Sequence, residues 1–305
     1  MGRHAYLIMA HKHFSLLQKE LLLLDDKRND IYIHIDQDAG KIDTEAIISG
    51  VHASRVFFIP RIKINWGGYS IAQCTINLIK AAIKNEDYQY YHLLSGADLP
   101  IKTQDEIHAF FQRENGKEFV SFDRPEPSKK ELQRVKQYYF FQDRYGRNYK
   151  RGKYILLYLM DLVSLKVQRC FGVDRLKGLK IELQKGPEWF SITHQLAQEV
   201  VKQEKWIRKY FRYTRCCDEV FLQTIINNSV YKKRLYQEGR KEGELPACLR
   251  KIDWGRGKPY VWTSKEYEEL INSKCFFARK FDPTVDEEII QKLSNYLLQK
   301  NLAGR

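Results

Sequence analysis

The sequence predicts an α/β fold in which a mainly parallel, twisted sheet is flanked by helices. Short apolar runs of strand length alternate with segments whose apolar residues recur at helical spacing. A strand, a helix and a second strand fit within about 30 residues near the start, which is typical of a parallel βαβ unit. With 43% hydrophobic and 13% aromatic residues, the 305-residue chain can bury a substantial core, which argues against disorder.

The first 120 residues carry the clearest pattern. Gly67 and Gly68 suggest a tight turn, and Ser70 is the expected N-cap of the helix that follows them. The loop after "YHLL" is expected to be polar and irregular. The elements expected in order are a strand at 5–10, a helix from Phe14 to about Leu24, strands at 30–36 and 55–60, a helix to about Lys84, a strand ending at Ser95 and a helix at 104–113.

Residues 121–305 are less regular. They contain a strand, turn and helix in "GPEWFSITHQLAQEVV", a buried helix in "DEVFLQTIINNS" and the tail "CFFARKFDPTVDEEIIQKLSNYLLQK". We find no repeat and no Pro/Gly/Ser-rich linker, so we predict one domain, 1–305, with halves at 1–120 and 121–305.

A basic and aromatic insertion is expected at about 138–171. Its "KYILLYLMDLVSLKVQR" stretch is apolar around much of a helix and is flanked by Lys153, Lys166 and Arg169. Such a helix either lies on an anionic membrane surface or packs into the core.

The net charge of +14 predicts attraction to an anion, whether a nucleic acid, a phosphorylated small molecule or a membrane face. The six cysteines form no C-x-x-C pair, so a zinc site is not expected. The N-terminal "MGRHAYLIMAHKHF" has too short an apolar run for a signal peptide or a membrane span. We therefore expect a cytoplasmic protein with reduced thiols.

Polar residues follow three expected strands: Asp36 and Asp38, the 95–98 loop, and the 66–68 turn. Ligands of open α/β sheets bind outside the carboxyl ends of the strands, although glycine and aspartate also populate ordinary turns. The D-x-D spacing of Asp36 and Asp38 suits a divalent ion on a nucleotide diphosphate, but it is a very short pattern.

Two basic clusters have fixed hydrophobic neighbours. One is Arg279 and Lys280 in "FFARKFDP", and the other is Arg256 and Lys258 in "WGRGKP". Fixed cations suit a departing diphosphate, while a solvated basic surface is the alternative interpretation. P-loop and Rossmann fingerprints are absent from the sequence.

Two adjacent carboxylates, Asp218 and Glu219, stand at the start of the helix in "CCDEVFLQTI". We expect Asp218 to cap the helix. Glu219 either complements the helix dipole or takes a proton from a hydroxyl nucleophile.

The ordered motifs "HKHFSLL…IYIHID…WGGYS…LLSGADLPIKT…KGPEWFSIT…DEVFLQT…IDW…FFARKFD" resemble glycosyltransferase family 14 over roughly residues 5–285. This is the core-2/I-branching N-acetylglucosaminyltransferase and peptide xylosyltransferase family. The resemblance implies a GT-A-like, inverting, metal-independent transferase without a cofactor. The 1–120 half would bind the nucleotide sugar, and the 121–305 half would hold the acceptor and the catalytic group.

Carried onto this sequence, the resemblance assigns the general base to Glu219 and a diphosphate contact to Lys280. For the second basic contact to the diphosphate, Lys258 is the first choice and Arg256 is the alternative. The remaining donor-side residues are Arg279, Asp36, Asp98, His11, Trp66 and Gly67, and the acceptor-side residues are Trp254, Lys130, Arg134, Asp123 and Trp189.

The resemblance implies transfer from a UDP-sugar to a glycan or a lipid-linked saccharide. N-acetylglucosamine is the first expectation for the sugar, with xylose or galactose as alternatives. The sequence lacks the anchor, stem and cysteine framework of animal members, so we expect a bacterial cytoplasmic enzyme of polysaccharide biosynthesis, peripheral on the inner face of the membrane.

Two further hypotheses compete. A nucleic-acid-binding protein would explain the charge and the interleaved aromatics, but no RRM, KH, helix-turn-helix or zinc-finger signature is present. A metal-dependent transferase would use Asp36 and Asp38.

Overall fold

The computed structural model describes residues 2–123, 127–236 and 247–303. At its centre is a six-stranded sheet with the order β3-β2-β1-β4-β7-β6. The first four strands in that order are parallel, and β7 pairs antiparallel with both β4 and β6. The predicted mainly parallel α/β sheet is therefore confirmed. The strands are β1 (His4–Ala10), β2 (Asn29–Ile35), β3 (Arg55–Phe58), β4 (Tyr90–Ser95), β6 (Phe119–Val120) and β7 (Phe190–Thr193).

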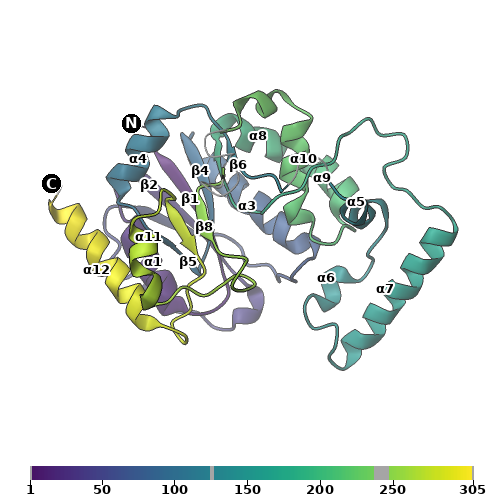
Figure 1. Ribbon diagram of the computed structural model, residues 1–305, viewed down its shortest axis with the longest axis horizontal. Helices are drawn as coiled ribbons and strands as arrows, with labels where there is room; N and C mark the ends of the chain where they lie inside the picture. The colour runs from purple at the N-terminus through teal and green to yellow at the C-terminus, as the bar shows by residue number, and fades with distance from the viewer. Residues whose placement is uncertain (1, 124–126, 237–246, 304–305) are drawn as a thin grey trace.

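Both faces of the sheet are covered, as expected of parallel strands with near-continuous apolar sequences. Successive side chains of β1 point to opposite faces. Tyr6 and Ile8 join one hydrophobic cluster, which includes residues of α1 (Phe14–Leu24) and α4 (Gln104–Arg113). Ala5 and Leu7 join another, which includes residues of α3 (Tyr69–Asn85), α8 (His194–Lys202), α9 (Glu204–Phe211) and α10 (Phe221–Asn227). Figure 1 shows α1 and α4 on one side of the sheet and α3 and α8 on the other.

A second, three-stranded sheet has the order β5-β9-β8. Its strands are β5 (Asp98–Pro100), β8 (Arg250–Ile252) and β9 (Phe277–Arg279). In the antiparallel pairing of β5 with β9, Asp98 lies opposite Arg279. The segment after Ser95, expected to be an irregular loop, is thus partly a strand, because residues nearly two hundred positions away supply its hydrogen-bonding partner. The C-terminal helix α12 (Glu287–Ala303) packs against α1.

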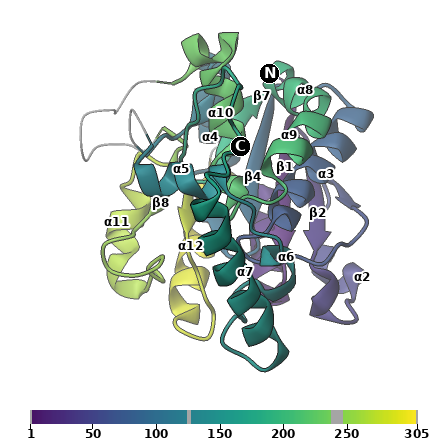
Figure 2. The ribbon, with the colours of Figure 1, turned by 90° about the vertical axis from the view of Figure 1, so that its right-hand side faces the viewer.

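The 138–171 insertion contains α6 (Gln142–Tyr145) and α7 (Lys153–Cys170), and it follows α5 (Lys129–Lys136). Figure 1 shows α7 at the margin of the molecule, on the side that faces the viewer in Figure 2, and most of its apolar side chains are exposed. The interpretation of this stretch as a core helix is therefore wrong. No helix within the described ranges combines the length and apolarity needed to cross a bilayer.

The start of α3 differs from the prediction. Its N-cap is Gly68, and the Ser70 hydroxyl instead lies 3.2 Å from Asp143 Oδ1. The single-domain organisation and its two halves stay predictions. The remaining short helices are η1 (Gln37–Ala39), α2 (Thr44–Ile48), η2 (Cys217–Glu219), η3 (Val230–Arg234), η4 (Ser264–Glu266) and α11 (Tyr267–Ile271).

Candidate active site

Three loops leave the same edge of the central sheet, where the parallel strands β1, β2 and β4 end. The Asp36 N–H donates to the Ala10 carbonyl at 2.9 Å, and the Gly96 N–H donates to the Met9 carbonyl at 3.0 Å. The loops therefore begin side by side. This brings His11, Asp36 and Asp98 to one region, as expected for a ligand site of an open α/β sheet.

The Arg279 guanidinium is fixed at this edge. Its Nη1 donates to the buried Asp98 carboxylate at 2.7 Å and also to the Ser95 hydroxyl. The guanidinium carbon lies 4.3 Å from the ring centroid of Trp189, which is only 4% exposed. Trp189, expected to contact the acceptor, thus forms the floor beneath Arg279. Asp98 and Trp189 together hold this cation in one position.

Four basic side chains form what we call the cation cluster: Lys12, Arg147, Arg279 and Lys280. Burial lowers the pKa of Lys280, and the charges of Lys12, Arg279 and Arg147 lower it further while Asp282 opposes them. Lys12 Nζ lies 3.5 Å from Asp282 Oδ2, so one carboxylate partly balances the cluster. A cluster of cations that disfavours its own charge is a site for an anion.

Sequence reasoning missed two members of the cation cluster. Lys12 follows His11 directly after β1, so its position at a strand end was the signal that could have identified it. Arg147 comes from the insertion, whose path the sequence pattern does not predict. Its guanidinium lies 4.6 Å from the ring centroid of the exposed Trp66. Burial and the neighbouring Lys12 lower the pKa of His11 at the same edge.

Asp36 and Asp38 both have partners within the protein. Asp36 Oδ1 accepts a hydrogen bond from the Asp38 N–H at 2.9 Å and so caps η1. Asp38 Oδ2 pairs with Lys63 Nζ at 2.6 Å. Within residues 2–123, 127–236 and 247–303, no group of three or more His, Cys, Asp or Glu side chains is placed to hold a metal ion.

Glu219 lies at the end of η2, directly before α10, and its side chain is partly exposed. Its Oε2 lies 3.4 Å from Lys185 Nζ and 3.6 Å from Arg134 Nη1. Lys185 also pairs with Asp123. The structure therefore brings Arg134 and Asp123, two expected acceptor contacts, next to the expected base. Lys130 is in the first turn of α5, and its side chain falls outside the described part of the chain.

Asp218 does not have the predicted capping role. The N-caps of η2 and α10 are Cys216 and Val220, and for both helices, which lie wholly within the described residues, the cap makes no side-chain hydrogen bond. Asp218 Oδ1 is buried and has no hydrogen-bond partner among those residues. Burial raises the pKa of Asp218 well above its ordinary value, and the negative charges of Glu188 and Glu219 raise it further.

Glu188 is the third functional candidate that sequence reasoning missed. Burial raises its pKa to about 7, Arg279 opposes this increase, and Glu219 and Asp98 reinforce it. Glu188 is thus electrostatically linked both to the cation cluster and to Glu219. We call Glu188, Asp218 and Glu219 the carboxylate cluster. The sequence signal for Glu188 was its position between Pro187 and Trp189, because Trp189 had already been selected as a candidate acceptor contact.

The requirement for glycine at position 67 has a structural reason that is independent of any ligand. Its φ is +74°, and a Cβ there would lie 3.1 Å from Gln142 Nε2. Its carbonyl accepts a hydrogen bond from the Cys216 N–H at 2.8 Å, three residues before Glu219. The 66–68 turn therefore connects the insertion to the segment that carries the expected base.

The 253–260 loop presents Trp254, which is largely exposed. The Arg256 guanidinium lies among three carboxylates, those of Asp253, Glu266 and Glu269. Lys258 is exposed in the same loop. The geometry therefore leaves Lys258 better suited than Arg256 to reach an anion.

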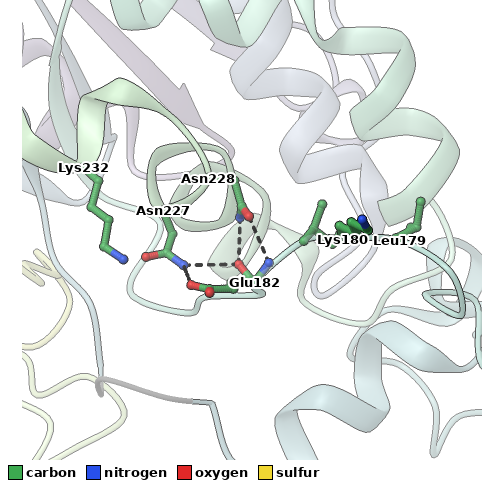
Figure 3. Close-up of a pocket in the computed structure, with 7 residues that line it drawn as sticks. Leu179, Lys180, Glu182, Asn227, Asn228 and Lys232 are labelled. Carbon is green, nitrogen blue, oxygen red and sulfur yellow. Dashed lines mark hydrogen bonds between the residues drawn. The ribbon is translucent and has the colours of Figure 1, made fainter.

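The depression in Figure 3 lies at the far end of α10 from Glu219 and has a volume of about 550 Å³. There the Asn228 amide donates to the Glu182 carbonyl at 2.8 Å, and the Asn227 amide donates to Glu182 Oε2 at 3.2 Å. These bonds hold the end of α10 to the preceding segment. The depression is therefore separate from the two clusters.

Comparisons with known proteins identify relatives of this chain. A sequence model described as "Branch: Core-2/I-Branching enzyme" matches residues 4–277. "Xylosyltransferase 2" of Rattus norvegicus is 23% identical over 97% of this chain and 34% of that protein. "Xylosyltransferase 1" of Homo sapiens is 23% identical over 99% of this chain and 31% of that protein. The chain spans about a third of the length of the curated relatives it matches.

Among solved structures, mouse xyloside xylosyltransferase 1 in its apo form matches with a TM-score of 0.36 and 10% sequence identity. The match covers 91% of this chain and 97% of that chain.

Proposed function

The chain belongs to the Core-2/I-branching enzyme family, and from this premise we propose that it is an inverting glycosyltransferase using a UDP-sugar donor. The acceptor is a hydroxyl of a glycan or a lipid-linked saccharide. The observation that carries the proposal is that one short segment contacts both sides of the site. The Arg279 guanidinium lies 4.3 Å from the Trp189 ring centroid, and the Gly186 N–H donates to the Glu219 carbonyl at 2.9 Å. An anionic leaving group needs positive charge beside it, and a hydroxyl nucleophile needs a carboxylate that can accept its proton.

In the proposed mechanism, Glu219 accepts the proton of the acceptor hydroxyl as that oxygen attacks the anomeric carbon from the face opposite the diphosphate. The bond from the sugar to UDP breaks, and Lys280 with Lys12 and Arg147 stabilises the charge that accumulates on the departing diphosphate. Arg134 and Lys185 hold the Glu219 carboxylate in position. The protein contributes orientation and charge stabilisation without a covalent intermediate.

Two donor sugars have separate support. N-acetylglucosamine follows from the family resemblance, and xylose is supported by the names of the relatives, which are xylosyltransferases. Galactose is the remaining alternative. We also propose that the reaction needs no metal ion, because the cation cluster supplies positive charge where the diphosphate departs. Bacterial origin and a role in polysaccharide biosynthesis at the cytoplasmic face of the membrane remain part of the proposal.

A donor panel tests the proposal. UDP-xylose, UDP-N-acetylglucosamine, UDP-galactose and UDP are added one at a time, and the melting temperature is measured, because a ligand that binds only the folded state raises it. We expect UDP and one UDP-sugar to raise it, and mass spectrometry to show that sugar on a saccharide acceptor.

The competing nucleic-acid hypothesis is tested on the same preparation. Tight, salt-dependent binding of RNA or DNA in a gel-shift assay, with no thermal response to any UDP compound, would contradict the proposed transferase.

A further inference from the structure

Helix α7 has the opposite arrangement to a typical helix of a globular protein: polar residues face the protein, and apolar residues face outward. Its polar residues Asp161 and Gln168 are buried against the protein, where Asp161 Oδ2 accepts from the Tyr145 hydroxyl at 2.9 Å. Gln168 bonds to both backbone groups of Tyr138, at 2.7 and 3.0 Å. These bonds fix the rotation of the helix about its axis, so its opposite face must point outward.

The outward face of α7 is apolar. Leu156 is 64% exposed and Val163 is 62% exposed, two turns apart on one side of the helix. A soluble helix places such residues against its core, as α3 does. A contiguous exposed apolar stripe of this kind marks a contact surface. The other exposed apolar residues of the helix and the residue after it are Ile155, Leu159, Met160, Leu162, Val167 and Phe171.

The charges around this face are all positive. Within 138–171, every residue of which the structure describes, both acids are withdrawn from the surface: Asp161 is buried, and Asp143 is half-buried and hydrogen-bonded to Ser70. The exposed charged residues of the segment are Arg144, Arg147, Lys150, Arg151, Lys153, Lys166 and Arg169. An apolar stripe with cations at both ends is the pattern of a helix that lies in the interface of an anionic bilayer.

We propose that α7 docks on an anionic lipid bilayer, with its apolar face in the interface and the surrounding cations against the headgroups. A second copy of the chain is a poorer occupant, because two copies meeting through α7 would bring both sets of cations together. Tyr149, Tyr154 and Tyr158 near the start of the helix fit the headgroup level, where tyrosine is enriched.

The docked helix would lie beside the candidate active site. Arg147 belongs to the cation cluster and precedes α7 by six residues. Tyr154, in the first turn of α7, is close enough to Lys63 to contribute to the pKa of that lysine, which its partner Asp38 chiefly raises. Docking would thus hold the strand-end loops close to the membrane, within reach of a saccharide linked to a lipid.

Vesicle flotation tests the proposal without any sugar donor, so its failure would leave the proposed sugar transfer untouched. We expect the protein to float with phosphatidylcholine–phosphatidylglycerol vesicles, with roughly tenfold stronger binding than to phosphatidylcholine alone and a decrease as salt is added. Absence of flotation with the anionic vesicles would overturn the proposal.

A pair of double variants separates α7 from general surface hydrophobicity. Leu156→Gln with Val163→Gln should weaken vesicle binding roughly tenfold or more. The matched control, Val230→Gln with Val285→Gln, changes residues that are 70% and 57% exposed elsewhere and should leave binding unchanged. All four sites are on the surface, and unchanged melting temperatures would show that the variants fold. Equal binding by both variants, or a solution dimer abolished only by the α7 variant without vesicle binding, would refute membrane docking.

A probe at the end of α7 reports its environment directly. All six cysteines are described, and Cys170 in the last turn of α7 is exposed while the other five are buried. A polarity-sensitive fluorophore on Cys170 should shift its emission to shorter wavelength on anionic vesicles. Flotation without that shift would show that another face binds lipid and would overturn the assignment to α7.

Discussion

The two sides of the candidate active site are built differently. Three of the four members of the cation cluster stand at strand ends: Lys12 follows β1, and Arg279 and Lys280 stand at the end of β9. The carboxylate cluster stands on irregular backbone, with Glu219 at the end of η2 and Glu188 in the segment before β7. Strand ends are positioned by a ladder of hydrogen bonds. The irregular side depends on ion pairs such as those of Glu219 with Lys185 and Arg134.

The difference teaches that the two sides carry opposite charge: positive side chains are crowded together on one side, and carboxyl groups on the other. On the regular side, burial and like positive charges lower the pKa of Lys280. On the irregular side, burial and like negative charges raise the pKa values of Glu188 and Asp218. In the proposed reaction both would be relieved, because the diphosphate would neutralise the cations and the acceptor hydroxyl would bring a proton to the base. Variants on each side should therefore fail in different ways.

The largest effect is expected on the carboxylate side. Glu219→Gln keeps the shape but cannot accept a proton, so kcat should fall by about 100-fold or more while UDP-sugar affinity is retained. Glu182→Gln is the control. It makes the same chemical change at a residue that contacts the other end of α10, and this variant should keep the wild-type kcat. Initial rates and donor titrations measure both. Turnover of Glu219→Gln at the wild-type rate would remove Glu219 from the mechanism.

The matching change on the cation side should affect binding. Lys280→Met keeps most of the length of the side chain and removes its charge. UDP affinity should therefore fall roughly 10- to 100-fold, which is the usual contribution of a hydrogen bond to a charged group. Lys292→Met on α12 is the control for loss of one positive charge, since Lys292 pairs only locally with Glu288 at 2.6 Å. Calorimetric titration with UDP at constant salt measures both. Equal affinities for the two variants would contradict a diphosphate site at Lys280.

A smaller effect should separate stability from function. Burial raises the pKa of Glu188 to about 7 from its ordinary 4.5. The folded protein therefore holds a proton that the unfolded chain has released, so this residue lowers the free energy of unfolding as pH rises from about 4.5 to 7. Relative to wild type, Glu188→Gln should gain about 1–3 kcal/mol between pH 5 and pH 8.

Glu118 provides the comparison for Glu188. Burial raises its pKa to about 7 as well, but its carboxylate bonds to Thr193 at 2.9 Å, on a strand within the core. Urea unfolding at both pH values should give Glu118→Gln a similar pH-dependent gain, whereas only Glu188→Gln should change the pH profile of transfer. A stability difference between variant and wild type that is the same at pH 5 and pH 8 would contradict the raised pKa values.

The smallest effect is expected from metal removal. Because the cation cluster supplies the positive charge, treatment with EDTA should leave the transfer rate unchanged, and added Mn²⁺ should not increase it. Initial rates before and after chelation measure this. A loss of activity that Mn²⁺ restores would instead implicate Asp36 and Asp38 as the metal clamp.

Much of the fold was predictable because local patterns determine it. The apolar runs and helical spacing of the first 120 residues placed β1, α1, β2 and α4 within a residue or two. The polar loops after β2 and β4 were predictable for the same reason, since parallel strands end at one edge of the sheet. Asp36 and Asp98 could therefore be assigned to one region from sequence.

The rest depended on contacts between distant segments. The pairing of Asp98 with Arg279 spans 181 positions, and no local pattern indicates that β5 and β9 are neighbours. Arg147 reaches the cation cluster through an insertion, and Glu188 acquires its raised pKa only from burial among Arg279, Glu219 and Asp98. The capping expectations for Ser70 and Asp218 were wrong because tertiary contacts overrode local preference.

The location of β9 near the end of the chain sets the order in which the protein matures during synthesis. The strands of the central sheet all precede residue 194, so that sheet can assemble while later residues are still being translated. Arg279 and Lys280 arrive only afterwards, when β9 inserts between β5 and β8. A nascent or prematurely terminated chain would thus possess its main scaffold and yet lack Arg279 and Lys280, two of the four members of the cation cluster.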